Sequence, residues 1–351
     1  MNRMSTTLPA LRGGLLALLA AALFGVSTPL VQQFGVGLGA FSTAALLYAG
    51  AAAVGLLSRQ RIEREARLQR SDLARLLAMA AFGAAIGPVA LAWGLQNTSG
   101  TSASLMLTLE ALFTAVLAWR LYRETMDGRV WTAMALLLAG GMVLVLDQGR
   151  TGGAQLWGLL AVLLATAAWG VDNTLSRALA ERDPGQVVMA KSLLGATATG
   201  ALALVFGEPL PSAIAALALF AIGATGYGLS LRFYLLAQRA FGAARTGSVF
   251  AFAPFIGAAF AVALGDRSAS GLMVLGSVLM LVGVVLHLAE SHGHEHEHEA
   301  LEHEHAHRHD DGHHDHVHDV TPVGEHSHRH WHEPARHAHP HVPDAHHAHR
   351  H

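Results

Sequence analysis

The chain has 351 residues, of which 52% are hydrophobic and 14% are charged, and its mean hydropathy is positive although the last 61 residues are very polar. Because it contains no cysteine, disulfides and thiolate metal sites are excluded, and cysteine usage reveals no redox compartment. The net charge of −2 gives no sign of a nucleic-acid partner.

Ten apolar segments follow one another, each about long enough to cross a ~30 Å hydrocarbon core as a helix. They are Gly13–Val31, Leu38–Leu57, Leu73–Leu95, Thr101–Leu121, Val130–Leu146, Leu156–Leu175, Val187–Phe206, Ala213–Leu236, Ala243–Leu264 and Gly271–Leu288. The first segment is interpreted as a retained helix, since no polar mature domain follows it as it would a signal peptide. The sequence therefore predicts an all-α integral membrane protein with ten transmembrane helices.

Arginine is spread unevenly between the loops. If the amino terminus is cytoplasmic, fifteen arginines lie in inside loops and helix ends, and only Arg150 and Arg267 lie outside. Ten spans then leave the carboxyl terminus in the cytoplasm too. We expect a multi-pass protein in the lipid bilayer of the plasma membrane, which is the inner membrane if the source is a Gram-negative bacterium.

The two halves repeat each other at nearly one offset. Phe24–Leu30 aligns with Trp169–Leu175. The other matches are Gln96 and Gly100 with Gln238 and Gly242, Glu110–Phe113 with Ala253–Ile256, Glu124 with Asp266, and Gly141 with Gly283. Because each unit has five spans, the second enters the membrane upside down. Inverted repeats of this kind place a substrate site near the midplane and permit alternating access.

This pattern resembles the drug/metabolite transporter superfamily, EamA type, over residues 12–290. The resemblance lies in the glycine-bearing first helix of each half and in the small residues, mid-helix Glu or Pro, apolar run and acidic residue that follow. It departs from the family at Glu110 and Ala111, where a proline is expected after the mid-helix position, while Pro254 is kept. It implies a cytoplasmic segment 1–11, repeats at 12–147 and 156–290 joined by a linker 148–155, and a tail 291–351.

Glu110 is the first candidate for function, since it lies near the middle of the span Thr101–Leu121. An acid there costs roughly 2.5–3.5 kcal/mol on insertion scales, so it should face a polar cavity or a partner. It could also exchange a proton.

Other polar residues inside the spans are assigned to the substrate pathway or to ion pairing. They are Gln96, Asp172, Asn173, Lys191, Tyr234 and Gln238. Lys191, the only lysine, lies about one turn from the cytoplasmic end. It either snorkels or pairs with Asp172, Glu110 or substrate. Gln96 and Gln238 correspond in the repeat and could instead cap helix ends or face headgroups.

The tail holds 23 of the 24 histidines and 12 acids. It cannot bury enough apolar surface to fold and is expected to be disordered. A flexible chain with imidazoles at alternate positions can gather around Zn²⁺, Ni²⁺, Co²⁺ or Cu²⁺. The alternative is a polar tail that responds to pH. The candidate ligands are His292, His294, His296, His298, His303, His305, His307, His309, His313, His314, His316, His318, His326, His328, His330 and His332.

Three function classes compete. We favour a secondary transporter, an exporter, of a small solute or metabolite by alternating access, with no required cofactor. The alternative is a divalent transition-metal transporter with the tail as cytoplasmic sink or sensor, although the body before His287 has no histidine or cysteine. An enzyme is not expected, because no motif pairs a nucleophile with a base. The sequence has no GxxxxGK[ST] phosphate loop, so a primary ATP-driven pump is not expected either. The sequence does not decide between a monomer and a homodimer.

Overall fold

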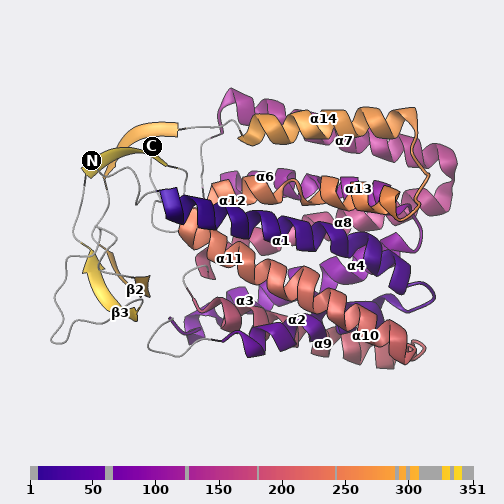
Figure 1. Ribbon diagram of the computed structural model, residues 1–351, viewed down its shortest axis with the longest axis horizontal. Helices are drawn as coiled ribbons and strands as arrows, with labels where there is room; N and C mark the ends of the chain where they lie inside the picture. Colours follow the sequence, from indigo (N-terminus) through magenta and orange to yellow (C-terminus); the bar gives the residue numbers. More distant parts are fainter. Residues whose placement is uncertain are drawn as a thin grey trace.

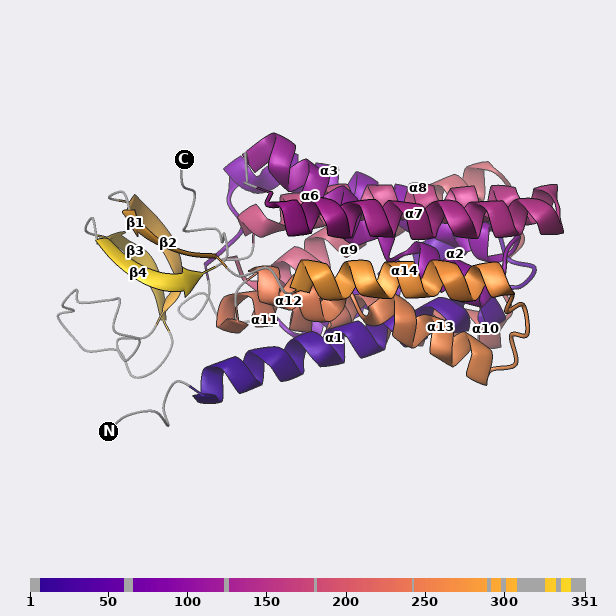
Figure 2. The same cartoon turned by 90° about the horizontal axis from the view of Figure 1, so that it is seen from above.

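The structure is a computed structural model that describes residues 7–59, 66–122, 126–179, 182–241, 243–288, 292–297, 301–307, 326–332 and 336–341. Its body is a bundle of helices that run along one common direction (Figure 1). The first helix begins at the same end of the bundle at which the last helix finishes (Figure 2).

The helices fall into two halves of similar order. The first half contains α1 (Thr7–Phe34), α2 (Ala40–Leu57), the 3₁₀-helix η1 (Arg70–Asp72), α3 (Leu73–Met79), the π-helix η2 (Ala80–Ile86), α4 (Gly87–Leu95), α5 (Gly100–Met106), α6 (Leu109–Tyr122) and α7 (Gly128–Thr151). The second half contains α8 (Gly153–Ser176), the 3₁₀-helix η3 (Arg177–Leu179), α9 (Pro184–Val205), α10 (Ala213–Ile222), the π-helix η4 (Gly223–Leu229), α11 (Ser230–Phe241), α12 (Ala243–Phe250), α13 (Ala253–Ala263) and α14 (Gly271–Leu288).

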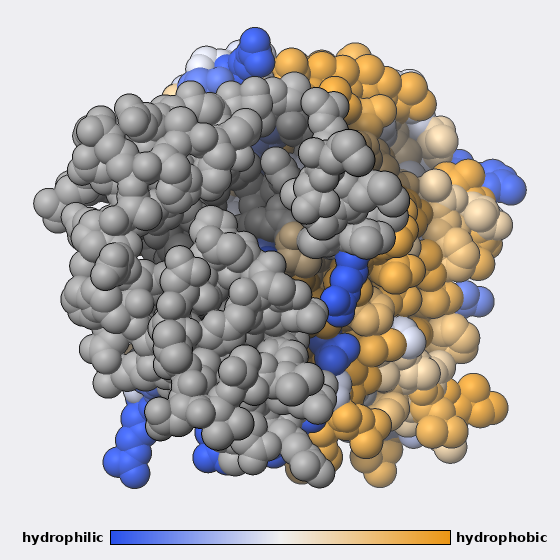
Figure 3. Space-filling model, turned by 60° about the vertical axis from the view of Figure 1, so that its left-hand side comes forward, coloured by the Kyte–Doolittle hydropathy of each residue, from blue (hydrophilic) through white to orange (hydrophobic). Residues whose placement is uncertain are grey.

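The surface of the bundle suits a bilayer. Within the described residues, nine helical stretches are long and apolar enough to cross a membrane, and the last predicted span is a shorter apolar helix, Gly271–His287. Apolar side chains gather on the outside of the helices (Figure 3); Leu57, for example, is 86% exposed. Apolar surface on this scale is unusual for a soluble monomer. The predicted multi-pass membrane protein is therefore confirmed.

Four of the predicted spans are interrupted, and the interruptions form two matching pairs. The π-helices η2 and η4 interrupt the third and eighth spans, and they begin 143 positions apart, at Ala80 and Gly223. The fourth and ninth spans break between α5 and α6 and between α12 and α13, and Pro254 lies in the first turn of α13. Since π-helical turns within α-helices are frequent at functional sites, a functional site is expected near these spans.

Glycines in the two π-helices allow a close approach of the first helix of each half. A Cβ on Gly83 of η2 would lie 2.3 Å from the Asp172 carboxyl group of α8. A Cβ on Gly226 of η4 would lie 2.3 Å from the Cβ of Ser27 on α1. Neither site has room for a side chain, so glycine is required at both.

Helices of one half pack between helices of the other. α1 packs on α11 and α13 of the second half, while α8 packs on α4 and α6 of the first half. α2 packs along α9, and α7 packs along α14 (Figure 1). Small residues at such contacts let backbones approach where lipid provides no hydrophobic drive between helices. As a result, side chains from both halves converge in the centre of the bundle.

Helices extend past two of the predicted boundaries. α1 begins at Thr7, and its membrane-spanning stretch begins at Arg12, after the segment 1–11. The predicted linker 148–155 is almost wholly helical, because α7 runs to Thr151 and α8 starts at Gly153. The turn between them is made at Gly152, whose φ of 145° favours glycine.

The tail was expected to be disordered, and where the structure describes it four short strands are present. β1 (His292–Glu297) pairs antiparallel with β4 (Arg336–His341), and β2 (Leu301–His307) with β3 (His326–His332). Histidine at every second position matches the period of a strand. A backbone ladder can form on that pattern without an apolar core. The other predicted ligands, His298, His309, His313, His314, His316 and His318, lie outside the described residues.

Candidate functional site

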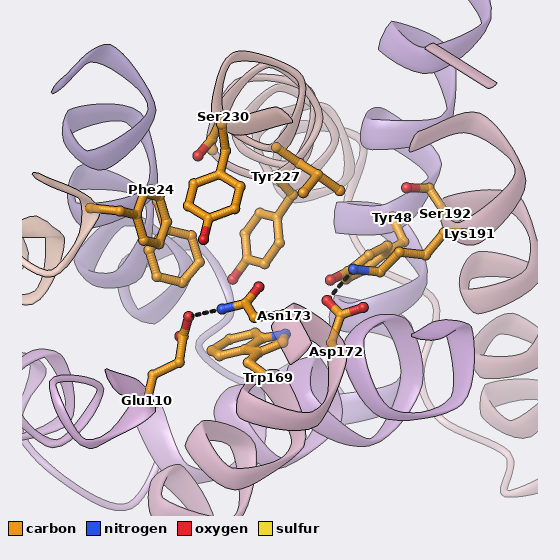
Figure 4. A pocket seen from close by; sticks show the side chains of 14 residues that line it. Phe24, Tyr48, Glu110, Trp169, Asp172, Asn173, Lys191, Ser192, Tyr227 and Ser230 are labelled. Carbon is orange, nitrogen blue, oxygen red and sulfur yellow. Dashed lines mark hydrogen bonds and ion pairs between the residues drawn. The ribbon is translucent and has the colours of Figure 1, made fainter. Parts of the chain in front are cut away.

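A cavity of about 60 Å³ lies among helices of both halves. Its polar side chains are Glu110, Asp172, Asn173, Lys191, Ser192 and Ser230. Its aromatic side chains are Phe24, Tyr48, Trp169, Tyr227, Tyr234 and Phe250 (Figure 4). Five of the seven residues predicted from the sequence for the substrate pathway or ion pairing are thus brought together here.

Glu110 reaches the cavity from the first turn of α6. Its backbone N–H donates to the Leu107 carbonyl at 3.0 Å, across the break that separates α6 from α5. Asn173 of α8 donates from Nδ2 to Oε1 of Glu110 (Figure 4). Because an amide is neutral, this hydrogen bond orients the carboxylate without balancing its charge. Glu110 is therefore suited to receive a proton or a cationic group.

Asp172 and Lys191 form an ion pair at another part of the cavity. Lys191 donates from Nζ to Oδ2 of Asp172, and the two side chains are 3% and 5% exposed (Figure 4). Of the two predictions for Lys191, the structure shows pairing rather than snorkelling. Oδ1 of Asp172 is buried and has no hydrogen-bond partner within the described residues. Since buried polar atoms are normally satisfied, this oxygen can accept a bond from a ligand.

Aromatic rings enclose the space around these polar groups. The ring centroid of Phe24 lies 5.6 Å from Trp169 and 5.4 Å from Phe250. The Tyr234 ring meets Phe250 edge-on, with centroids 5.1 Å apart. Tyr227 stands 5.8 Å from Phe24. These distances fall in the range of favourable aromatic pairs, so the wall is held in a defined shape.

The π-helix η2 contributes a carbonyl that helps to hold this wall. The Gly83 carbonyl accepts a hydrogen bond from Trp169 Nε1 at 3.0 Å and a second one from the Tyr48 hydroxyl. Irregular backbone at membrane depth is tolerated where protein groups satisfy it. The break in the helix therefore positions two rings of the cavity.

Most of the aromatic wall was not predicted from the sequence. The aromatic residues concerned are Phe24, Tyr48, Trp169, Tyr227 and Phe250, and the polar lining residues Ser192 and Ser230 were not predicted either. A usable signal existed for Phe24 and Trp169, which begin the aligned stretches of the two first helices. The other rings sit on apolar helices, where an aromatic residue of the wall looks the same as one facing lipid.

Two predicted pathway residues lie elsewhere. Gln96, at the end of α4, donates from Nε2 to the Leu38 carbonyl at 2.9 Å and so ties a loop to a helix end. Gln238 is on α11, one turn beyond Tyr234, and does not line the cavity. Their correspondence in the repeat reflects similar positions near helix ends.

Acidic side chains join the two halves at the end of the bundle remote from Thr7. Asp266 accepts from the Thr101 backbone N–H at 2.9 Å and from its hydroxyl at 2.8 Å. Glu208 accepts from the backbone N–H groups of Phe41 and Ser42, at the start of α2, at 3.1 and 2.7 Å. At the opposite end, Arg182 pairs with Asp72 at 2.9 Å. Carboxylates at helix N-termini are favourable, so these bonds hold the bundle closed beyond the cavity.

The pKa of Asp266 is consistent with this role. Partial burial by itself would raise the pKa of the carboxyl group, but hydrogen bonds from Ser268 and Thr101 outweigh it, and the pKa lies below its usual value. The charged form is therefore the one that the fold stabilises.

The helical body was also compared with the geometry that a metal site requires. Among the residues that the structure describes, no group of three or more His, Cys, Asp or Glu side chains is arranged to hold a metal ion. The two acids of the cavity bond to different partners, Glu110 to Asn173 and Asp172 to Lys191. The body thus provides no support for a transition-metal site.

Comparison with known proteins agrees with this architecture. A "Probable amino-acid metabolite efflux pump" of Escherichia coli is 25% identical over 202 residues, covering 53% of this chain and 66% of the relative. An "Uncharacterized transporter" of Methanothermobacter thermautotrophicus is 27% identical over 237 residues, covering 64% of this chain and 67% of the relative. A solved structure titled "Crystal structure of protein" matches with a TM-score of 0.55 at 20% identity, covering 82% of this chain and 98% of that one, which shows a shared fold.

The chain also matches a family model, and it does so twice, at residues 11–146 and 156–289. The two matches cover both halves of the helical body. These similarities indicate a transporter rather than an enzyme. On this basis the chain belongs to the EamA-like transporter family.

Proposed function

We propose that this protein is a secondary transporter that exports a small organic solute by alternating access. The observation that carries the proposal is the cavity, which contains buried ionisable groups from α6, α8 and α9 inside an apolar bundle. Burying such groups in a membrane protein is costly, and they generally mark a substrate or ion pathway. The name of the Escherichia coli relative supports the direction of export.

The two halves act, in this proposal, as inverted repeats of five spans. The double family match, the matching π-helices and the exchange of packing between α1 and α8 support it. In such repeats one unit rocks against the other around a fixed central site. The cavity between the halves has the position that this motion requires.

Orientation follows from the arginines. Both chain ends of the helical body lie at one end of the bundle (Figure 2), which supports an even number of crossings. With the arginine-rich loops inside, this end is cytoplasmic, and the Asp266–Thr101 and Glu208–Ser42 contacts close the outer end. The protein then resides in the plasma membrane with both termini in the cytoplasm.

Glu110 is the proposed coupling residue, because it is the cavity carboxylate bonded to a neutral amide. A suitable test is a screen of radiolabelled solutes in proteoliposomes with and without an imposed pH gradient. Transport of at least one solute that depends on this protein supports the proposal. If no solute, from amino acids through amines and sugars to organic acids, moves faster than through empty liposomes, a transport function is overturned.

The tail has a separate proposed role, the binding of divalent transition metals. Its strand register supports this, because histidines face histidines across both ladders: His294 faces His339 and His296 faces His337 in one, and His305 faces His328 in the other. Facing positions of an antiparallel pair lie only about 4.5–5.5 Å apart and share one face. Two neighbouring histidine pairs therefore bring together four imidazole-bearing positions, which is the ligand number of a zinc site.

The register makes this metal-binding role testable. Equilibrium dialysis with Zn²⁺ should show that His294→Ala with His339→Ala weakens one class of sites and leaves another intact, whereas His294→Ala with His305→Ala weakens both, since only the first pair faces across one ladder. The same pattern of loss in both double variants would mean that pairing of the strands has no part in binding. Retention of all bound Zn²⁺ after removal of residues 292–351 would overturn binding by the tail.

A further inference from the structure

The charges of the cavity do not balance. Counted over the described lining residues, it holds two carboxylates, Glu110 and Asp172, and one cation, Lys191. Lys191 is already engaged by Asp172, whereas the side chain bonded to Glu110 is the neutral amide of Asn173. Away from water, an unpaired carboxylate is costly, and a positive ligand is the natural way to compensate it.

Glu110 and the Asp172–Lys191 ion pair occupy different parts of the cavity. Figure 4 shows Glu110 beside Phe24, with Asn173 and Trp169 between it and the Asp172–Lys191 pair. An ammonium group placed on Glu110 is thus separated from the positive charge of Lys191 by neutral side chains. The ring centroids of Phe24 and Trp169 are 5.6 Å apart, and both rings lie in the part of the cavity that contains Glu110 (Figure 4).

Aromatic faces add a second attraction for a cation. A ring quadrupole attracts an ammonium group within about 6 Å of its centroid, most strongly when the site is desolvated. The same rings can pack on an aromatic or branched apolar group of the ligand. A cavity with one unpaired carboxylate and several rings therefore matches a molecule with one positive charge and an apolar body.

We propose that the transported solute is a small monocationic amine with an aromatic or comparably large apolar group. Its ammonium group bonds to Glu110 and its apolar body contacts Phe24, Trp169 and Phe250. This assignment rests on the proposed transport function, since it names the substrate class of the same cavity.

The geometry disfavours the corresponding amino acid. The carboxylate of an α-amino acid lies next to its ammonium group, so it would be brought close to Glu110 and repelled. Lys191, the one cation among the described residues that line the cavity, lies at the far side and already bonds to Asp172 (Figure 4). A zwitterion would have to break that buried pair to find a partner, which an amine does not require.

A matched set of ligands tests the proposal on the purified full-length protein in detergent. Phenethylamine, phenylalanine and 3-phenylpropionate share one aromatic body and differ in their charged groups. By isothermal titration we expect phenethylamine to bind roughly tenfold or more tightly than phenylalanine, and 3-phenylpropionate to bind most weakly. Tighter binding of phenylalanine or of 3-phenylpropionate would overturn the assignment.

Variants connect the binding to the named side chains. Glu110→Gln should weaken phenethylamine binding roughly tenfold or more, while Glu110→Asp, which keeps the charge, should retain part of it. Phe250→Leu should reduce the ratio of the affinity for phenethylamine to the affinity for ethylamine. The control is Asp127→Asn, a carboxylate that caps the start of α7 and does not line the cavity, which should leave the affinity unchanged. An unchanged affinity in Glu110→Gln would overturn the role of Glu110.

The outcome separates this inference from the transport proposal. Flux of an amino acid or an acid in proteoliposomes, with no binding of phenethylamine, would overturn the amine assignment and leave the transport function standing. Binding of phenethylamine without flux of any amine would support the site chemistry and contradict transport.

Discussion

Lys191, the only lysine of the chain, donates from α9 to Asp172 on α8, and both side chains are almost fully buried. The pair occupies a wall of the cavity, where η2 approaches so closely that Gly83 has no room for a side chain next to Asp172. Neither charge has water as an alternative partner. The stability of this part of the fold therefore depends on both residues being present together.

Removing one member of the pair should destabilise the protein more than removing both. Lys191→Met alone leaves the Asp172 carboxylate buried and unpaired, which costs about 3–5 kcal/mol for typical buried pairs. Combining it with Asp172→Asn removes the stranded charge and should recover at least half of the lost stability. Thermal unfolding in detergent measures both variants. A double variant less stable than Lys191→Met would contradict this account.

Glu110→Gln should reduce transport roughly tenfold or more while the protein remains inserted and folded. The amide has nearly the shape of the carboxylate and can still bond to Asn173, but it carries neither charge nor exchangeable acidic proton. Initial rates of flux in proteoliposomes give the effect, and size-exclusion chromatography with circular dichroism gives the control. Wild-type rates at every pH tested would show that the charge is dispensable.

Asp266→Asn should weaken the closed end of the bundle. The aspartate caps the start of α5 from the other half of the chain, and loss of a cap typically costs about 1 kcal/mol. Because the pKa of this carboxyl group is lowered in the fold, its stabilising effect is present above the unfolded pKa of about 3.9 and is lost as the pH falls through the folded value.

The pH dependence of that variant provides its own check. The difference in melting temperature between wild type and Asp266→Asn should be constant from about pH 5 to 8 and shrink below about pH 4. A difference that grows as the pH falls would have the wrong sign for a carboxylate stabilised in its charged form.

Deletion of residues 292–351 should abolish high-capacity Zn²⁺ or Ni²⁺ binding to the purified protein and leave flux at saturating substrate measurable. The cavity is lined by helices of the body, whereas the deleted segment begins after α14. Metal counting by equilibrium dialysis and a liposome assay on both proteins measure the two effects. Complete loss of flux, with the body still folded, would place the histidines in the transport mechanism.

Reporters should locate the arginine-rich side of the membrane. A fluorescent or phosphatase reporter fused after Ser291, or inserted between Arg59 and Arg70, should report the cytoplasm, since arginine is retained on that side. A periplasmic signal from either position would be incompatible with ten spans in the proposed orientation.

The amino-acid sequence by itself determined that the protein spans a membrane, where its helices lie and that Glu110 is unusual. Hydropathy and helix length are properties of continuous stretches, so they can be read from the chain in order. Glu110 could be recognised from the sequence because an acid near the middle of a membrane span is costly unless a cavity or partner compensates it. Similarity between the halves was likewise visible in aligned residues such as Phe24 and Trp169.

Tertiary structure alone decided which side chains meet. Lys191 is 19 positions from Asp172, which the sequence offered only as one of several alternatives. Glu110 is 63 positions from Asn173, and no local pattern indicated that contact. The same holds for the shared acceptor of Trp169 and Tyr48, a backbone carbonyl freed by a π-helix that hydropathy does not reveal. Inside an apolar bundle, a polar or aromatic residue acquires its role from the few neighbours within bonding distance, and packing of distant helices selects those neighbours.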